Sequence, residues 1–210
     1  MAAGPNTRLR ADARRNRDQI LVAAREMFGV QGPGVPMEEI ARVAGVGVGT
    51  LYRRFPDRES LILAVAQETF SRVIEDAHAA IAEEPTAWAA LKRLISRSRE
   101  LQLSFRLAWS STGAHAILPA DPKSQRLRND LMAALARIVE AAQEEGTMRR
   151  DVGVGDIAVL LVLLVRRPPI ETEPQIDAFD RAVAIMLDGL RASATGPLPG
   201  RPLDLTDLCA

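Results

Sequence analysis

The 210-residue sequence predicts an all-α fold. Hydrophobic residues make up 47% of the chain but aromatic residues only 4%, and Ala and Leu fill most apolar positions, which favours helices packed on helices. Apolar residues recur at helical spacing through most of the chain, and clusters of Gly and Pro separate these segments. A chain of this length can bury a core either as one domain or as a small domain beside a larger one.

The first 60 residues predict three helices, at 15–30, 37–44 and 48–55. The first two are separated by "QGPGVP", whose glycines and prolines cannot continue a helix. Gly45 can end the second helix because it can adopt a positive φ, and Pro56 ends the third. Two short helices joined by a tight turn after a longer one are the order of a helix-turn-helix unit.

The rest of the chain predicts five further helices. Their expected ranges are 58–81, 86–109, 123–145, 156–166 and 173–194. Asp57 is expected to cap the first of them, and Gly146 to end the third in a left-handed conformation. The closing segment "TGPLPGRPLDLTDLCA" is rich in Pro and Gly, so residues 196–210 are predicted to be a flexible tail.

The formal net charge is zero, but basic residues are concentrated near the N-terminus. Residues 1–60 carry ten arginines against seven acidic residues. Five of these arginines, Arg8, Arg10, Arg14, Arg15 and Arg17, come before Asp18, and Asp12 is the one acid among them. This pattern is expected of a flexible basic arm over residues 1–14 that approaches phosphates, although solvated surface arginines would give the same pattern.

Several other classes of protein are disfavoured. Cys209 is the single cysteine, so a disulfide framework or cysteine metal site within the chain is excluded, which suits the cytoplasm. No secretory signal is predicted, and the longest apolar run, residues 157–165, is far shorter than a membrane span. No nucleophile, metal-ligand or acid–base set is visible around the two histidines, so neither an enzyme nor a cofactor is predicted.

The stretch "GVGVGTLYRRFPDRE" at 45–59 has too many glycines for an ordinary helix turn. A phosphate-binding loop would need a strand before its glycines, but "MEEIARVA" has a helical pattern, and no GxxxxGK[ST] is present. In a helix-turn-helix unit, Gly47 and Gly49 would let the start of the third helix approach a duplex closely. Thr50 could then offer its hydroxyl and methyl groups to base edges.

Leu51 and Phe55, four residues apart, supply the inward face of this third helix. Tyr52, Arg53 and Arg54 point in successive directions, so they cannot all face the core, and they carry phosphate or guanine donors. A partly buried packing tyrosine and solvated arginines are the alternative interpretation. The predicted DNA-binding residues are Arg14, Arg15, Arg17, Gly47, Val48, Gly49, Thr50, Tyr52, Arg53, Arg54 and Arg58.

Residues 20–65 resemble the DNA-binding domain of TetR-type transcriptional regulators, whose pattern includes "IA..AGVS.GTLY.YF..KE.L". The matching positions are Phe28, Gly32, Ile40, Ala41, Ala44, Gly45, Val46, Gly49, Thr50, Leu51, Tyr52, Phe55, Glu59 and Leu61. Arg58 stands where the family often has a phosphate-contacting lysine. The chain departs from the pattern at Gly47 and Val48, where Ser and Lys are common, and at Pro36, so one helix-capping hydroxyl and one cation are missing.

The resemblance continues more weakly in "EEGTMRRDVGVGDIAVLL" and "LDGLRA". It implies a domain at 15–60 that binds DNA and a helical domain at 61–195 that binds a ligand and forms a homodimer through about 156–192. The apolar run at 157–165 independently favours a partner surface, although burial within one subunit would also explain it. A twofold dimer is expected to bind a palindromic double-stranded operator.

The expected activity is therefore that of a ligand-responsive regulator, most simply a repressor, released by a small and largely apolar effector. Ordinary core packing is the alternative role for each candidate pocket residue. The candidates are Phe70, Trp88, Phe105, Trp109, His115 and Met132. A helical protein–protein adaptor that does not bind specific DNA is the alternative function; it would bind a duplex no better than an inert protein.

Overall fold

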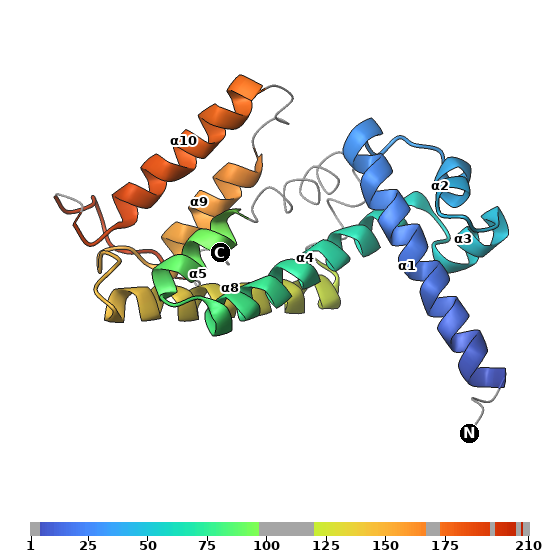
Figure 1. Ribbon diagram of the computed structural model, residues 1–210, viewed down its shortest axis with the longest axis horizontal. Coiled ribbons are helices and arrows are strands. Elements are labelled where there is room, and N and C mark those ends of the chain that lie inside the picture. Colours follow the sequence, from blue (N-terminus) through green and yellow to red (C-terminus); the bar gives the residue numbers. More distant parts are fainter. Residues whose placement is uncertain (1–4, 97–119, 167–172, 194–195, 205–206, 208–210) are drawn as a thin grey trace. The chain divides into compact units, whose positions relative to one another are not determined.

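The computed structural model describes residues 5–96, 120–166, 173–193, 196–204 and 207. Across these residues the regular structure is helical, apart from an isolated antiparallel bridge between Met148 and Arg191, and this confirms the all-α prediction. The helices (Figure 1) are α1 (Pro5–Gln31), α2 (Met37–Val43), α3 (Val48–Arg54), α4 (Arg58–Glu83), α5 (Ala87–Ser96), α8 (Pro122–Glu144), α9 (Val154–Arg166) and α10 (Glu173–Leu190).

The first helix is longer than predicted. It begins at Pro5, so the residues expected to form a flexible arm, from Pro5 to Arg14, are helical. Proline suits a first helical position because its missing N–H has no partner there, and Leu, Ala and Arg after it are good helix formers. A high density of arginines therefore does not by itself indicate a flexible segment, because arginine is also a good helix former.

The α2–α3 unit matches the predicted helix-turn-helix within one residue at each end. Ala44 N donates to Ile40 O at 2.9 Å, and Gly45 then turns the chain with φ +67°. Gly47 precedes α3 in an extended conformation, and Thr50 N and Leu51 N both donate to its carbonyl oxygen. Gly146 likewise ends α8 at φ +67°, as its position after a helical segment predicted.

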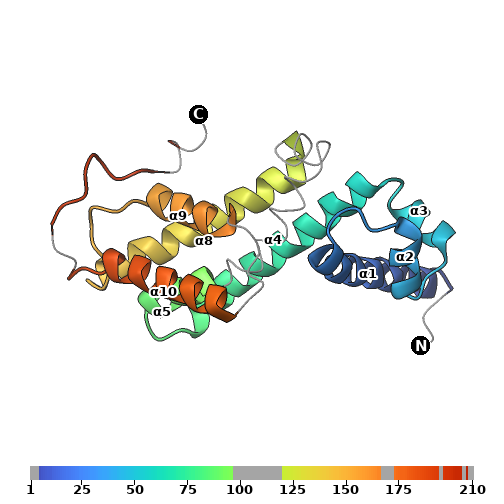
Figure 2. The ribbon, with the colours of Figure 1, turned by 90° about the horizontal axis from the view of Figure 1, so that it is seen from above.

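Residues 5–69 and 120–125 form the described part of one compact unit. α1, α2 and α3 lie together in both views (Figure 1, Figure 2), and the first turns of α4 complete their core. Each large side chain buried here contributes about 1.5–3 kcal/mol. The largest fully buried members are Ile20, Phe28, Ile40, Leu51, Leu61 and Ile62. Because Leu61, Ile62 and Val65 belong to this core, the unit extends to Thr69 and not to the predicted boundary at residue 60.

The start of α8 is capped within the same unit. Asp121 Oδ2 accepts hydrogen bonds from Ser124 N at 2.7 Å, Ser124 Oγ at 3.0 Å and Gln67 Nε2 at 2.8 Å. The bond from the Ser124 backbone, together with smaller contributions from the other donors, holds the pKa of Asp121 below its usual value. This carboxylate satisfies a free N–H of the first helical turn and pairs with the buried Gln67 amide.

The second unit contains residues 70–96, 126–166, 173–193, 196–204 and 207. Thr86 Oγ1 accepts from Ala89 N at 3.1 Å and caps α5, while Glu145 accepts from Ala87 N at 2.9 Å. Arg93 on α5 donates to Asp76 at 2.7 Å and to Glu83 at 2.9 Å on α4. These ionic bonds raise the pKa of Arg93 and fix the angle between the two helices.

The predicted flexible tail is in part a bound segment. Gly155 N donates to Leu203 O at 2.9 Å, and Asp156 Oδ2 accepts from Leu203 N at 3.2 Å and Gly153 N at 2.8 Å. A Cβ atom on Gly153 would lie 2.0 Å from Leu203 O, so only glycine admits the segment there. Residues 196–204 therefore pack on the start of α9, in a place that composition alone did not indicate.

Candidate nucleic-acid interface

α3 is anchored by one face and exposes the other. Leu51 is fully buried and Phe55, which follows the helix, is 4% exposed, as their spacing predicted. Tyr52, Arg53 and Arg54 are exposed and Thr50 is half-buried. This accessibility is what a DNA contact requires. The contact itself stays a prediction, and because Tyr52 is 40% exposed, the alternative of a partly buried packing tyrosine stays open.

Thr50 and Arg53 are joined on this exposed face. Arg53 Nη2 donates to Thr50 Oγ1 at 3.1 Å. The bond uses one lone pair of the hydroxyl and leaves its proton available for an acceptor outside the protein. It also leaves Arg53 with four further N–H donors, enough for a bidentate contact with a guanine or a phosphate.

Tyr52 has a partner that the sequence did not indicate. Its hydroxyl donates to Glu38 Oε1, in the first turn of α2, at 3.0 Å. A backbone hydrogen bond at Glu38 and the bond from Tyr52 lower the pKa of Glu38, while the bond to Glu38 raises the pKa of Tyr52. At neutral pH the pair therefore consists of a carboxylate and a protonated phenol. The sequence signal for this pair is a carboxylate in the first turn of α2, close along the chain to the basic residues of α3.

Arg58 is engaged inside the unit. Its Nη1 donates to the carbonyl oxygen of Pro33 at 2.7 Å and to that of Val35, in the connection between α1 and α2. The side chain is half-buried at the start of α4. The arginine thus holds this connection in place, and its predicted role as a phosphate contact is not excluded because other guanidinium donors remain.

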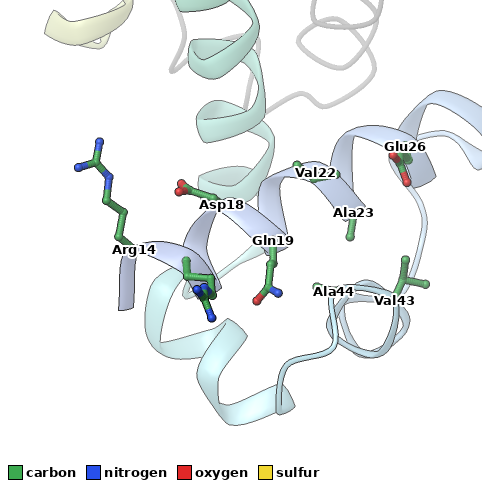
Figure 3. Close-up of a pocket in the computed structure, with 9 residues that line it drawn as sticks. Arg14, Asp18, Gln19, Val22, Ala23, Glu26, Val43 and Ala44 are labelled. Atoms are coloured by element: carbon green, nitrogen blue, oxygen red, sulfur yellow. The ribbon is translucent and has the colours of Figure 1, made fainter. Parts of the chain in front are cut away.

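Two arginines of α1, Arg14 and Arg15, border a groove. Arg14 and Arg15 are exposed and Arg17 is half-buried. Arg17 Nη1 lies 3.9 Å from Asp18 Oδ1. The groove has a volume of about 680 Å³ and is open to solvent. In Figure 3 the side chain of Arg14 points away from the groove, whereas that of Gln19 points towards the end of α2. Its lining residues are Arg14, Arg15, Asp18, Gln19, Val22, Ala23, Glu26, Val43 and Ala44.

The glycines before and within α3 are not required by internal packing. A Cβ atom on Gly49 would meet nothing within 4 Å, and one on Gly47 would come no closer than 4.0 Å to Thr50 Oγ1. Gly47 caps α3 without a side-chain hydrogen bond, as the departure from the family pattern predicted. Val48 beside them is 41% exposed. The absence of side chains here is consistent with close approach of a large partner to the start of α3.

The candidate effector-binding residues are only partly described. Phe70 on α4 and Met132 on α8 are half-buried, and Trp88 on α5 is buried. Phe105, Trp109 and His115 lie outside the described residues. The groove of Figure 3 lies in the other unit, so the composition of an effector pocket stays a prediction.

The described residues offer neither a metal site nor a membrane-spanning helix. No group of three or more His, Cys, Asp or Glu side chains in the described residues could hold a metal ion. No helix among those residues is long and apolar enough to cross a membrane.

The fold and the exposed α3 define a helix-turn-helix protein, and comparisons with known proteins agree. Residues 20–65 match the family model described as bacterial regulatory proteins, tetR family, and residues 106–192 match the C-terminal domain of SbtR-like transcriptional regulators. A curated HTH-type transcriptional regulator of Staphylococcus aureus (strain USA300) is 35% identical over an alignment of 78 residues that covers 33% of this chain. The chain spans only 42% of that relative's length.

Solved structures extend the similarity over most of the chain. A TetR transcription regulatory protein from Mycobacterium vanbaalenii is 34% identical with a TM-score of 0.62, covering 87% of this chain and 99% of that one. A TetR transcriptional regulator from Streptomyces coelicolor is 31% identical with a TM-score of 0.64, covering 85% and 99%. The chain belongs to the TetR family of bacterial regulatory proteins. It is accordingly a transcriptional regulator with a DNA-binding helix-turn-helix domain, and this class is not enzymatic.

Proposed function

We propose that the chain is a repressor that binds a palindromic operator as a homodimer and is released by a small, largely apolar effector. The DNA-binding role is supported by the accessible side of α3. Leu51 packs this helix into the core, while Tyr52, Arg53 and Arg54 are exposed and Thr50 is half-buried. The arginine and threonine donors on this short helix suit both phosphates and base edges in the major groove. The helical arginines of α1 would add phosphate contacts outside the groove.

The dimer is supported by apolar side chains left on the surface of α9 and α10. Leu163 is 62% exposed and Val159 is 36% exposed on α9, and Ile185 is 69% exposed on α10. Burying such residues against a second copy would remove apolar surface from water on both sides of a twofold axis. Two copies of α3 would then meet major-groove faces about 34–36 Å apart, which requires a palindromic operator.

An effector site in the second unit is supported by Trp88. Its side chain is buried, and its Nε1 is the one buried side-chain polar atom of the described residues without a hydrogen-bond partner. A buried indole N–H without an acceptor is unfavourable, and an effector oxygen or nitrogen would satisfy it. The effector would release the operator by stabilising a conformation with a different spacing of the two α3 helices.

The operator is tested by gel shift and footprinting with the DNA that flanks the protein's own gene. The expected result is protection of two half-sites about 10 base pairs apart, with affinity that falls steeply as salt rises. If the protein binds this DNA no more tightly than an inert protein does, the proposal is refuted and the adaptor alternative is favoured.

The dimer is tested by sedimentation of Leu163→Glu, which would place a charge in the proposed interface. Expected is dissociation to monomers together with loss of operator binding, since two half-sites must be bound at once. Val30→Glu, which places the same charge on an 87% exposed apolar residue of α1 outside the proposed interface, is the matched surface control, and it should remain dimeric. A monomeric wild type, or a dimeric Leu163→Glu variant, would exclude this interface.

A further inference from the structure

A carboxylate lies on the face that should meet DNA. Glu38 is exposed in the first turn of α2 and accepts the hydrogen bond of Tyr52 on α3 at 3.0 Å. Arg53 and Arg54 are neighbours of Tyr52 along the same exposed helix. A negative charge there repels phosphates, so a surface made only for tight binding would not contain it.

The bond to Glu38 changes what Tyr52 can recognise. A tyrosine hydroxyl has a single proton, and here that proton is donated to the carboxylate. The phenol oxygen keeps only acceptor lone pairs, as do the two oxygens of Glu38. A phosphate oxygen is also an acceptor, so Tyr52 cannot bind it in this state. The joined side chains form a small surface of acceptors beside the donors of Arg53 and Arg54.

Acceptors at this place have two suitable partners in the major groove, the amino groups of cytosine N4 and adenine N6. We propose that Glu38 is a specificity-determining residue that keeps the Tyr52 proton from phosphates, so that the pair favours cytosine or adenine at one position of the contacted strand and disfavours guanine or thymine there. The inference rests on the proposed operator binding. Glu38 then has two effects: it lowers the affinity of the protein for duplex of arbitrary sequence, and it selects one base in each half-site.

Glu38→Gln tests the inference because it keeps the shape but removes the charge, leaves only a weaker neutral acceptor for the Tyr52 proton, and replaces one acceptor oxygen with an N–H₂ donor. Its affinity for random-sequence duplex should rise roughly three- to tenfold, since one repulsive charge near the phosphates is lost. The preference for the amino-bearing base, scored with operators substituted at each position, should weaken at one position per half-site. An unchanged ratio of operator to random-duplex affinity would overturn the inference.

Glu39→Gln is the matched control. Glu39 is adjacent on α2 and loses the same charge, but it lies 3.7 Å from Arg42 and is not joined to Tyr52. It should leave the base preference as in the wild type, with a smaller change in random-duplex affinity. Equal changes in the two variants would show a net-charge effect and would refute the role of Glu38.

Tyr52→Phe separates action through Tyr52 from direct repulsion. It removes the hydroxyl and keeps the ring. Glu38→Gln should therefore change the ratio of operator affinity to random-duplex affinity less in the Tyr52→Phe protein than in the wild type. Additive effects would contradict the pairing. Failure of wild-type protein to prefer its operator over random duplex would instead refute the proposed function itself, and circular dichroism of each variant confirms that the compared proteins are folded.

Discussion

Replacing Arg58 by alanine is expected to destabilise the DNA-binding unit from within. Arg58 Nη1 bonds the carbonyl oxygens of Pro33 and Val35, and Val35 is only 3% exposed. A hydrogen bond to a charged group contributes about 1.5–3 kcal/mol, and because one nitrogen makes both bonds their contributions are shared and not added. The free energy of unfolding should therefore fall by about 2–3 kcal/mol, as the connection between α1 and α2 loses its attachment to α4.

The assay is urea unfolding monitored by circular dichroism, with Arg54→Ala as the matched control. Arg54 undergoes the same chemical change but is exposed on α3, so its variant should stay within about 0.5 kcal/mol of the wild type. In salt titrations of operator binding, Arg54→Ala should reduce the slope by about one unit. Equal stability of the two alanine variants would refute the assignment of Arg58 as an internal attachment.

Two further predictions concern the bound segment and the cap of α8. A Cβ atom on Gly155 would lie 2.5 Å from Asp204 O, so Gly155→Ala should displace residues 203–204 and lower the free energy of unfolding by about 1–3 kcal/mol. The control is Gly34→Ala, whose Cβ atom would meet nothing within 4 Å and which should be neutral or slightly stabilising. Equal urea midpoints for the two variants would contradict this prediction. Asp121→Ala should cost about 0.5–2 kcal/mol at pH 7 through loss of the cap. The pKa of Asp121 is lowered on folding, so its ionic contribution is present above the unfolded pKa of about 3.9 and is lost as pH falls through the folded value. The difference in free energy of unfolding between the wild type and Asp121→Ala should therefore shrink at pH 3. If this difference does not depend on pH, the charge does not contribute.

Much of the helical architecture was predictable because local signals mark the ends of helices. Gly45, Pro56 and Gly146 stop helices for reasons that act within a few residues, and the structure places helix ends beside all three. The inward face of α3 followed from the spacing of Leu51 and Phe55. The first helix was predicted too short because a run of arginines has no apolar period from which its helical conformation could be recognised.

Contacts between distant segments were not predictable from the sequence. Composition indicated flexibility for residues 196–210, yet Gly153 and Gly155 make room for Leu203 about fifty positions later. The Tyr52–Glu38 bond depends in the same way on the angle between α2 and α3. Single-residue chemistry identified the exposed side chains of α3, whereas the partners of those side chains required the structure.

The affinity of Arg53→Ala for the operator tests the central claim most directly. If α3 lies in the major groove, this variant should bind the operator with about 1–3 kcal/mol less free energy while its unfolding transition stays that of the wild type. Binding as tight as that of the wild type, by a folded Arg53→Ala protein, would contradict the placement of α3 against DNA.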